Sequence, residues 1–183
     1  MLIRDVEEKD IEKLVAIYKP YVENTVITFE NEVPTVEEFK KRVEKVKGKF
    51  PYLVVEENNE ILGYAYASNF HERMAYQWTV EVSIYLSSDA KGKGLGKKMY
   101  AELEKKLKEQ GVKTLTACIT YPGQGSVQFH EKLGYEKVAH FKNVGFKMGS
   151  WYDVVWYQKQ IANYSNEVVD IKLYKDINNK GEK

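Results

Sequence analysis

The stretch from Thr79 to Gly111 constrains the fold of this chain most, because it indicates a strand, a tight glycine-rich loop and a helix in succession. From Val80 to Leu86, apolar and polar residues alternate, which is the pattern of a strand with one buried face. After a loop with three glycines, apolar residues return at helical spacing, and Gly111 ends the pattern. The apolar positions of this expected helix are Leu95, Met99, Tyr100, Leu103 and Leu107.

The loop between this strand and helix, KGKGLG from Lys91 to Gly96, has the chemistry of an anion site. Glycines let the backbone approach a ligand closely, and the unpaired N–H groups at a helix start favour negative charge. Lys97 and Lys98 add positive charge, so a diphosphate is the expected ligand. The spacing fits neither the P-loop nor the dinucleotide-binding fingerprint. A flexible turn with solvated lysines is the alternative that the glycines alone leave open.

A Gln/Arg-x-x-Gly-x-Gly/Ala pattern directly after a strand resembles motif A of the GCN5-related N-acetyltransferases, which bind the diphosphate of acetyl-CoA. Lys91 stands where that family has Gln or Arg, which keeps the charge but loses a planar donor. Three further motifs, SNFHERMAYQW, FHEKLGY and GFKMGSWYDVVWYQ, make the chain similar to the phosphinothricin N-acetyltransferase subfamily from Leu2 to Gln160. The resemblance implies one domain over residues 1–160, an α/β fold of the α+β type with a mixed, mostly antiparallel sheet flanked by helices.

The remaining segments fit such a fold. Helical spacing of apolar residues predicts helices over 10–22, 36–47 and 126–133, the second with a capping box of Thr35 and Glu38. Pro20 removes a backbone donor, so we expect the first helix to kink or break there. Residues 161–183 lie beyond the resemblance and permit a further strand, a helix or disorder. Alternation and turn residues predict strands over 2–4, 52–56, 60–68, 113–120, 135–146 and 151–160.

Charge balance and cysteine content bear on partners and compartment. Lys and Arg total 28 and Asp and Glu total 27, which argues weakly against a dedicated nucleic-acid-binding protein. Cys118 is the only cysteine, so no intramolecular disulfide is expected, and a cytoplasmic protein is the simplest interpretation. The N-terminal residues lack a signal-peptide pattern, and no apolar run is long enough to span a membrane. His71, Glu72 and His140 lack the spacing of a metal site, so no metal is expected.

Acetyl transfer to an amine requires a base, and Glu81 is the best candidate because it lies in the middle of the apolar strand. Partial burial would raise its pKa towards working pH. The residues alone leave a solvent-facing Glu equally open, but the resemblance places the subfamily's catalytic glutamate here. His130 shares a helical arc with Val127, Phe129 and Leu133, so we expect it to face inward. It is either a site residue, as the resemblance implies, or a satisfied core histidine.

The resemblance also implies the residues that hold acetyl-CoA. Family members pair the pantetheine amides with free backbone groups of the strand, and they bind the diphosphate at the loop. Gly123 stands where the family has Asn, so that side-chain contact is missing unless Gln124 replaces it, and Lys132 either reaches the 3′-phosphate or is solvated. The implied residues are Ile84, Tyr85, Leu86, Gly92, Lys93, Gly94, Leu95, Gly96, Lys97, Gly123 and Lys132.

The acceptor site is expected just before the catalytic strand. Arg73 offers a planar fork for a substrate carboxylate, although without the resemblance a surface ion pair is the simpler interpretation. Tyr76 and Phe29, the latter in an exposed-looking loop over 25–32, are expected to wall the pocket. Met148 replaces the histidine of the subfamily motif GFKxGxWxDV, which changes the expected pocket. The implied acceptor residues are Phe29, Arg73, Met74, Ala75 and Tyr76.

These residues together predict an acetyl-CoA-dependent N-acetyltransferase that acts on a small amino-acid-like amine by direct attack. Subfamily substrates include phosphinothricin, methionine sulfone and methionine sulfoximine. Cys118 lies inside an expected strand and is a poor nucleophile, so no acetyl-enzyme is expected. The alternatives are a protein or peptide N-acetyltransferase and a non-catalytic acetyl-CoA-binding module, which would not require Glu81. Subfamily members are often dimers, so we expect a homodimer.

Overall fold

The computed structural model describes residues 1–90 and 92–178, so the expected contribution of Lys91 lies outside the described residues. Within this part of the chain, one seven-stranded sheet has the order β1-β2-β3-β4-β5-β7-β6. Only β4 and β5 pair in parallel among these neighbours, which confirms the mixed, mostly antiparallel sheet. The strands are β1 (Leu2–Asp5), β2 (Tyr52–Glu57), β3 (Glu60–Asn69), β4 (Thr79–Leu86), β5 (Thr114–Tyr121), β6 (Glu136–Lys147) and β7 (Ser150–Gln160).

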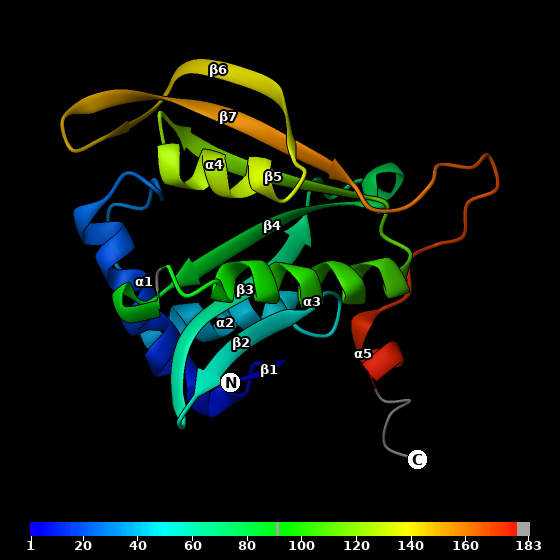
Figure 1. The fold of residues 1–183 in the computed structure, drawn as a ribbon, viewed down its shortest axis with the longest axis horizontal. Coiled ribbons are helices and arrows are strands. Elements are labelled where there is room, and N and C mark those ends of the chain that lie inside the picture. Colours follow the sequence, from blue (N-terminus) through cyan, green and yellow to red (C-terminus); the bar gives the residue numbers. More distant parts are fainter. Residues whose placement is uncertain (91, 179–183) are drawn as a thin grey trace.

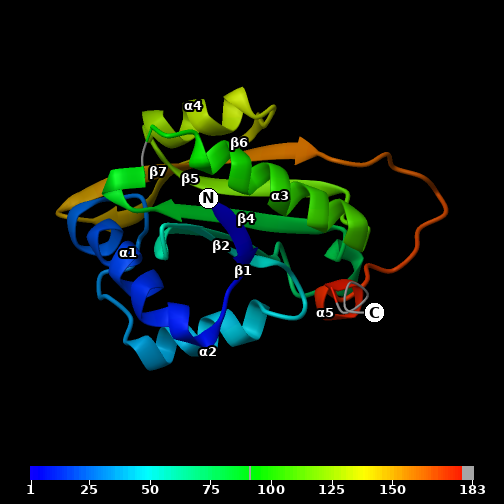
Figure 2. The same ribbon diagram turned by 60° about the horizontal axis from the view of Figure 1, so that its bottom comes forward.

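Helices cover both faces of this sheet. Figures 1 and 2 show α1 and α2 on one face and α3 and α4 on the other. Three short 3-10 turns, η1 (Glu8–Asp10), η2 (Met74–Tyr76) and η3 (Ser88–Ala90), lie between the larger elements. The helices are α1 (Ile11–Asn24), α2 (Val36–Val46), α3 (Leu95–Gln110), α4 (Gln124–Lys132) and α5 (Tyr174–Asn178).

Local sequence signals account for most element boundaries. The capping box at α2 is confirmed, because Glu38 N–H donates to Thr35 Oγ1 at 3.2 Å and Thr35 N–H donates to the Glu38 carboxylate at 2.8 Å. The expected break at Pro20 is wrong, since α1 runs uninterrupted to Asn24. Buried side chains before and after Pro20, including Tyr18 and Tyr21, hold the helix against the sheet through that point.

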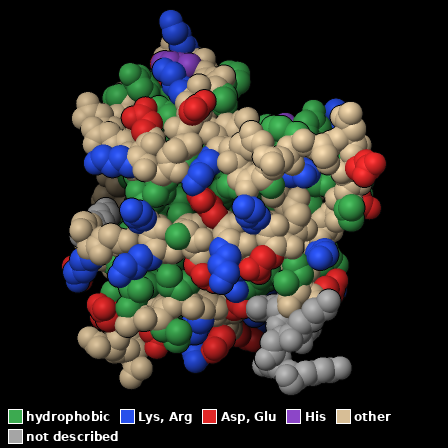
Figure 3. Space-filling model, turned by 45° about the vertical axis from the view of Figure 1, so that its right-hand side comes forward, with side chains coloured by type: hydrophobic (Ala, Val, Ile, Leu, Met, Phe, Trp, Pro, Cys, Tyr) green, Lys and Arg blue, Asp and Glu red, His purple; other side chains and the backbone are tan. Residues whose placement is uncertain are grey.

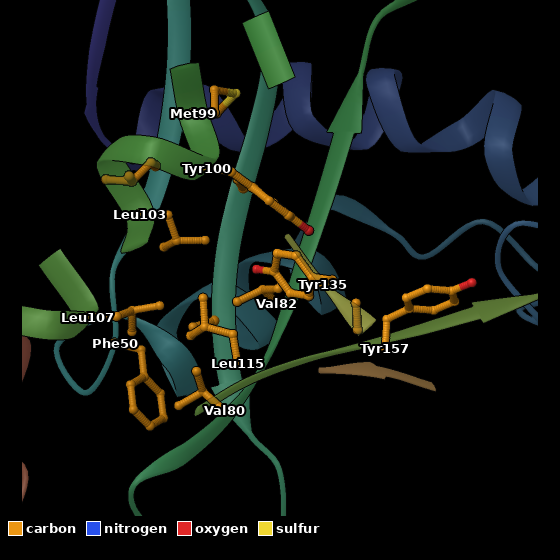
Figure 4. Close-up of a cluster of buried hydrophobic side chains, with 14 of the residues drawn as sticks. Phe50, Val80, Val82, Met99, Tyr100, Leu103, Leu107, Leu115, Tyr135 and Tyr157 are labelled. Carbon is orange, nitrogen blue, oxygen red and sulfur yellow. The ribbon is translucent and has the colours of Figure 1, made fainter. Parts of the chain in front are cut away.

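The core forms two layers, one on each face of the sheet. The expected apolar face of α3 is confirmed, because Met99, Leu103 and Leu107 are all fully buried. Figure 4 shows these side chains gathered with Val80 and Leu115 between α3 and the sheet. The layer on the other face is built by α1 and α2 and is rich in tyrosine. The central strand β4 is therefore covered on both faces, and close packing on each face holds this strand in place.

Residues 161–178 cross the end of the domain as a largely irregular segment and finish in the five-residue helix α5. Tyr174 is 6% exposed, and its hydroxyl donates to Asp5 Oδ1 at 2.8 Å. The Gln110 side chain at the end of α3 donates to the backbone carbonyl of Lys172 at 2.7 Å. These contacts make the segment a strap, residues 161–178, that connects the end of α3 to β1.

The surface carries charges of both signs. On the face drawn in Figure 3, Lys and Arg side chains are interspersed with Asp and Glu, as the balanced composition leads us to expect. Of the helices in residues 1–90 and 92–178, none has the length and apolar character required to cross a bilayer.

Candidate active site

The site begins where two parallel strands separate. Residues Thr79–Glu81 of β4 pair with Thr114–Thr116 of β5. Each strand continues for five further residues that do not pair with the other strand. Beyond the paired residues β4 remains paired with β3 and β5 with β7, so the two strands separate (Figure 1). A cleft lies between them. The cleft is lined by the separating halves of both strands, by the start of α4 and by Tyr100 of α3.

Glu81 is the last residue of β4 that pairs with β5, so it lies at the closed end of the cleft, where the two strands begin to separate. Its side chain lies on the same face of β4 as Ser83, the face covered by α1 and α2. The carboxyl group is half-buried, and this burial raises its pKa above the usual range for Glu. A carboxylate with a raised pKa at the junction of two strands has the properties of a general base.

The backbone of β4 presents polar groups alternately to β3 and to the cleft. Ser87 N–H donates to Leu62 of β3, and Thr116 of β5 donates its hydroxyl proton to Val80 C=O at 3.0 Å. These two bonds show which residues of β4 direct their backbone groups towards β3 and which direct them towards β5. Ile84 therefore directs its N–H and C=O into the cleft, whereas those of Tyr85 belong to the β3 ladder. An added strand-like ligand would find its partners at Ile84.

The third expected backbone site, Leu86, is already bonded to a side chain that the sequence analysis did not identify. The Tyr21 hydroxyl of α1 donates to Leu86 C=O at 2.6 Å and accepts from Leu86 N–H at 3.2 Å. No short-range pattern predicts this contact, because 65 positions separate the two residues. Tyr21 thus ends the free edge of β4 just before the glycine loop.

The loop after β4 has the backbone of an anion site. Gly92 and Gly94 have φ values of +79° and +73°, and an added Cβ at either position would meet open space. Gly94 is the N-cap of α3, so the free N–H groups of the first turn face this open side. Gly96 serves packing instead, because its added Cβ would lie 3.0 Å from the Phe129 ring. The space beside Gly92 and Gly94 is therefore open, and the exposed side chains of Lys93 and Lys97 lie in the same segment.

His130 faces inward from α4 and is 4% exposed. Its Nδ1 lies 2.8 Å from Ser126 C=O, which can only accept, so Nδ1 carries the proton. Its Nε2 lies 3.2 Å from the Tyr100 hydroxyl. Burial lowers the pKa of the imidazole, which keeps it neutral. His130 is thus a satisfied, oriented histidine that also lines the cleft, and both interpretations of this residue have a structural basis.

The Cys118 thiol opens onto the same cleft from β5. Burial by the surrounding strands, together with the nearby Glu81 charge, raises its pKa to about 12. The group is therefore a protonated thiol at neutral pH, which makes it a weak nucleophile.

The expected acceptor residues lie around η2 and are largely exposed. Met74 is 71% exposed, and the Arg73 side chain has no ion pair or hydrogen bond among the described residues, so the surface ion pair is not found. Phe29 corrects the expectation of an exposed loop residue, because it is half-buried. Its ring covers Gly145 of β6, where an added Cβ would lie 2.4 Å from the ring. Phe29, Arg73 and Tyr76 line neither the β4–β5 cleft nor the cavity between α2 and the sheet.

A family model described as "Acetyltransferase (GNAT) domain" matches residues 3–156 of this chain. The chain belongs to the GNAT acetyltransferase family. It is 34% identical over 157 residues to a phosphinothricin N-acetyltransferase of Streptomyces viridochromogenes, covering 86% of each chain. It is 31% identical over 160 residues to an L-methionine sulfoximine/L-methionine sulfone acetyltransferase of Pseudomonas aeruginosa, covering 85% of this chain and 92% of that one.

A solved structure extends the comparison to the cofactor. The GNAT superfamily phosphinothricin acetyltransferase of Sinorhizobium meliloti, solved in complex with acetyl-CoA, matches with a TM-score of 0.86 and 34% identity. The match covers 94% of this chain and 97% of that one. This GNAT chain is therefore an acetyl-CoA-dependent N-acetyltransferase, and acetyl-CoA is its cosubstrate.

Two further expected cofactor positions of this GNAT enzyme lie on α4. Gly123 is its N-cap, and an added Cβ there would lie 2.4 Å from Thr120 C=O, so this backbone excludes the family's Asn side chain. Gln124 and Lys132 are exposed at opposite ends of the helix. Across residues 1–90 and 92–178, His, Cys, Asp and Glu side chains form no cluster of three or more that could hold a metal ion.

A second cavity of this GNAT enzyme was not foreseen from the sequence. It has a volume of about 300 Å³, lies between α2 and the sheet, and is lined by Tyr52, Tyr64 and Tyr66, among others. The alternation of Tyr64 and Tyr66 along β3 indicates that both face one side. That α2 would leave space above them depends on tertiary packing, which no local pattern encodes.

Proposed function

We propose that this enzyme transfers the acetyl group of acetyl-CoA directly to the α-amine of a small amino-acid-like acceptor, with Glu81 as general base. The main support for this proposal is the position of Glu81 at the closed end of the β4–β5 cleft. On one side of Glu81 the cleft opens along β4 towards the loop, and on the other lies the face of the sheet covered by α1 and α2. One side receives the acetyl donor and the other the amine.

In this proposal, different residues bind acetyl-CoA and accept the proton of the amine. Gly92, Gly94 and the first turn of α3 hold the diphosphate, and Ile84 pairs with the pantetheine amides. Acetyl-CoA supplies an acetyl thioester, whose C–S bond breaks as the amine nitrogen forms the new C–N bond. Glu81 accepts the proton that the protonated amine must lose before it can attack. After the C–N bond has formed, the nitrogen loses a second proton, which converts the leaving thiolate into the thiol, and the proton held by Glu81 passes to solvent.

His130 acts in this scheme as a positioning residue. The Ser126 carbonyl fixes its tautomer, and its Nε2 holds the Tyr100 hydroxyl beside the cleft. A neutral, fixed imidazole keeps the cleft wall polar without adding a charge near Glu81. The raised pKa of Cys118 supports direct transfer over an acetyl-cysteine intermediate.

The acceptor class is proposed from the relatives and from Arg73. The relatives named above act on phosphinothricin and on methionine sulfoximine or sulfone, which are α-amino acids with oxygen-bearing side chains. Arg73 has no internal partner among the described residues, so its guanidinium is available for the α-carboxylate. Met74, Ala75, Tyr76 and Phe29 then flank the bound acceptor.

We also propose that the enzyme is a homodimer. β6 is an edge strand, and apolar side chains remain exposed along the β6–β7 hairpin. An edge strand with exposed apolar side chains favours association with another surface. We call this set the hairpin patch, and it consists of Val138, Phe141, Val144, Phe146 and Trp151, which are 49–61% exposed.

Acetyl-CoA consumption measured against a panel of amino acids and peptides tests the function. Wild type should turn over L-methionine sulfone or phosphinothricin and leave peptide N-termini and lysine side chains largely unreacted. Glu81→Gln should bind acetyl-CoA as wild type does but lose most of the turnover. Preferred acetylation of peptides would instead assign the enzyme to protein acetylation, and binding of acetyl-CoA without turnover of any amine would assign a binding module.

A further inference from the structure

The cavity between α2 and the sheet opens on the face of the sheet that carries Glu81. It has a volume of about 300 Å³, enough for the side chain of an amino acid, and we call it the tyrosine cavity. Tyr52 of β2 and Tyr64 and Tyr66 of β3 supply its floor. The Tyr52 and Tyr66 rings stack with centroids 4.7 Å apart and planes within 4°, so their orientation is fixed.

Two hydroxyl groups in the tyrosine cavity have no protein partner. Tyr52 is 4% exposed and Tyr64 is 1% exposed, and neither hydroxyl makes a hydrogen bond to any described residue. Tyr18 nearby shows the usual arrangement, because its hydroxyl bonds to Thr28 at 2.7 Å and to Glu30 at 2.9 Å. Neither the Tyr52 nor the Tyr64 oxygen is among the fully buried side-chain atoms without a partner, which are Ser87 Oγ and Gln110 Oε1 among the described residues. Both hydroxyls therefore reach accessible space and are free to donate to a group that enters the cavity.

The tyrosine cavity adjoins the proposed base. Ser68, which lines it, lies directly opposite Glu81 in the β3–β4 ladder, and Tyr66 lies opposite Ser83. Burial, together with the Glu81 charge, raises the pKa of the Tyr66 hydroxyl. From strand spacing, the Cα atoms of Glu81 and Tyr52 lie roughly 12 Å apart, two strands and two residues away. A bound amino acid can bridge this distance when the Glu81 and Tyr52 side chains both extend towards the ligand.

Charges at the cavity favour a ligand that accepts hydrogen bonds. Arg42 of α2 pairs with Glu30 through two contacts of 2.6 and 3.0 Å, so those two charges offset each other. Lys45 and Lys49 also line the cavity, against one further acid, Glu72. The balance is slightly positive. Donor hydroxyls in a slightly positive cavity suit sulfone, sulfoximine, phosphinate or carboxylate oxygens rather than an ammonium or an unsubstituted alkyl chain.

We propose that the tyrosine cavity is the subsite for the side chain of the acceptor, where the Tyr52 and Tyr64 hydroxyls donate hydrogen bonds to an oxygen-bearing terminal group. This inference rests on the proposed amino-acid acceptor and assigns the part of the site that distinguishes one amino acid from another. Arg73 would hold the α-carboxylate and Glu81 would face the amine, so the three ends of the acceptor meet three different elements.

A pair of matched substrates tests the subsite. L-Methionine sulfone and L-methionine share their α-groups and chain length, and they differ in the two sulfone oxygens. Wild type should prefer the sulfone in kcat/KM. Tyr52→Phe and Tyr64→Phe should each reduce this preference about tenfold, mostly through KM for the sulfone, which corresponds to one lost hydrogen bond. Methionine turnover should change less than about twofold. Tyr157→Phe, which removes a hydroxyl bonded to Glu131 away from the cavity, is the matched control.

Thermal unfolding and direct binding separate this proposal from its alternatives. Tyr52→Phe and Tyr64→Phe remove hydroxyls with no protein partner, so the melting temperature should not fall, and a changed preference then reports binding rather than folding. An unchanged sulfone preference in both variants would overturn the subsite. If wild type turned over neither substrate, calorimetric binding of the sulfone would decide. Binding that weakens about tenfold in Tyr52→Phe would retain the subsite while the proposed reaction fails, and absence of binding would overturn both.

Discussion

At the scale of single residues, Glu81 determines how activity should depend on pH. Burial raises its pKa, and only the ionised carboxylate can accept a proton, so wild-type activity should fall as pH decreases through this raised pKa. Glu81→Gln should lower kcat by about 10²–10⁴-fold near neutral pH, the usual contribution of general base catalysis. The deficit should shrink as pH rises, because more of the amine is then unprotonated without help.

A pH–rate profile at saturating acetyl-CoA is the measurement that decides this. The wild-type profile should contain an acidic limb that is absent from Glu81→Gln. Similar rates and parallel profiles for the two proteins would remove Glu81 as the base. His130→Ala, measured alone and together with Glu81→Gln, then shows whether the imidazole or bulk water takes the proton.

The same pKa shift implies that Glu81 lowers stability at neutral pH. The unfolded carboxyl has a pKa of about 4.3, and the folded value is higher, so the native state binds more protons between the two values. Stability therefore falls as pH rises through this window, and the loss is fully present above the folded pKa. Glu81→Gln should be at least as stable as wild type at pH 7 in urea unfolding, and the difference should vanish below about pH 4.

Residue roles were predictable where they depend on neighbours in the sequence. The Thr35–Glu38 capping box follows from local chemistry alone. The exposure of Phe29 was misjudged because its ring packs on Gly145, which lies on a strand more than a hundred positions away. The Tyr21 contact to Leu86 and the hydroxyls of the tyrosine cavity depend likewise on which helix lies over which strand.

At the scale of elements, the two ends of α3 separate ligand binding from helix capping. Gly94 and Gly111 both have positive φ, +73° and +97°, at the N-cap and C-cap of the same helix. Valine at either position should destabilise the fold by about 1–2 kcal/mol, because a branched side chain is strained in this conformation. Only Gly94→Val also places atoms in the open space above the anion loop. Calorimetry should show acetyl-CoA affinity reduced at least tenfold in Gly94→Val and near wild type in Gly111→Val.

Equal affinities in these two folded variants would place the diphosphate elsewhere.

This comparison also tests the part of the site that the sequence predicts best. The strand, loop and helix are consecutive, so their alternation, glycines and helical spacing describe the geometry directly. The acceptor side is built from α1, α2, β3 and η2, which meet only in the folded chain, and its arrangement could not be derived in the same way.

The strap is an element in which Tyr174 is the buried aromatic side chain. Tyr174 is 6% exposed and bonds to Asp5, whereas Tyr164 in the same segment is 60% exposed. Tyr174→Ala should lower the free energy of unfolding by about 2–4 kcal/mol, as expected for loss of a buried aromatic side chain. Tyr164→Ala should change it by less than about 1 kcal/mol. Urea unfolding measures both, and equal effects of the two substitutions would show that the strap does not stabilise the domain through Tyr174.

At the scale of the whole molecule, the β6–β7 hairpin is the feature that a monomer leaves uncovered. It projects from one side of the sheet in Figure 1, and its partner-free edge carries the hairpin patch. Phe146 contacts Trp151 with ring centroids 5.3 Å apart, and Phe29 covers Gly145 on the same hairpin. An interface at the patch would therefore lie beside the loop that is proposed to flank the acceptor.

A charge in the hairpin patch should dissociate the proposed homodimer without unfolding either subunit. Phe146 is 54% exposed, so Phe146→Glu loses little packing within one chain, but a two-fold interface would bury the new carboxylate twice. Wild type at micromolar concentration should sediment with twice the 21.3 kDa chain mass, and Phe146→Glu with that mass once. Val169→Glu, at a position that is 81% exposed on the strap, is the matched control and should remain dimeric. A wild-type monomer over the whole concentration range, or a Phe146→Glu protein that stays dimeric, would show that this patch does not hold two copies together.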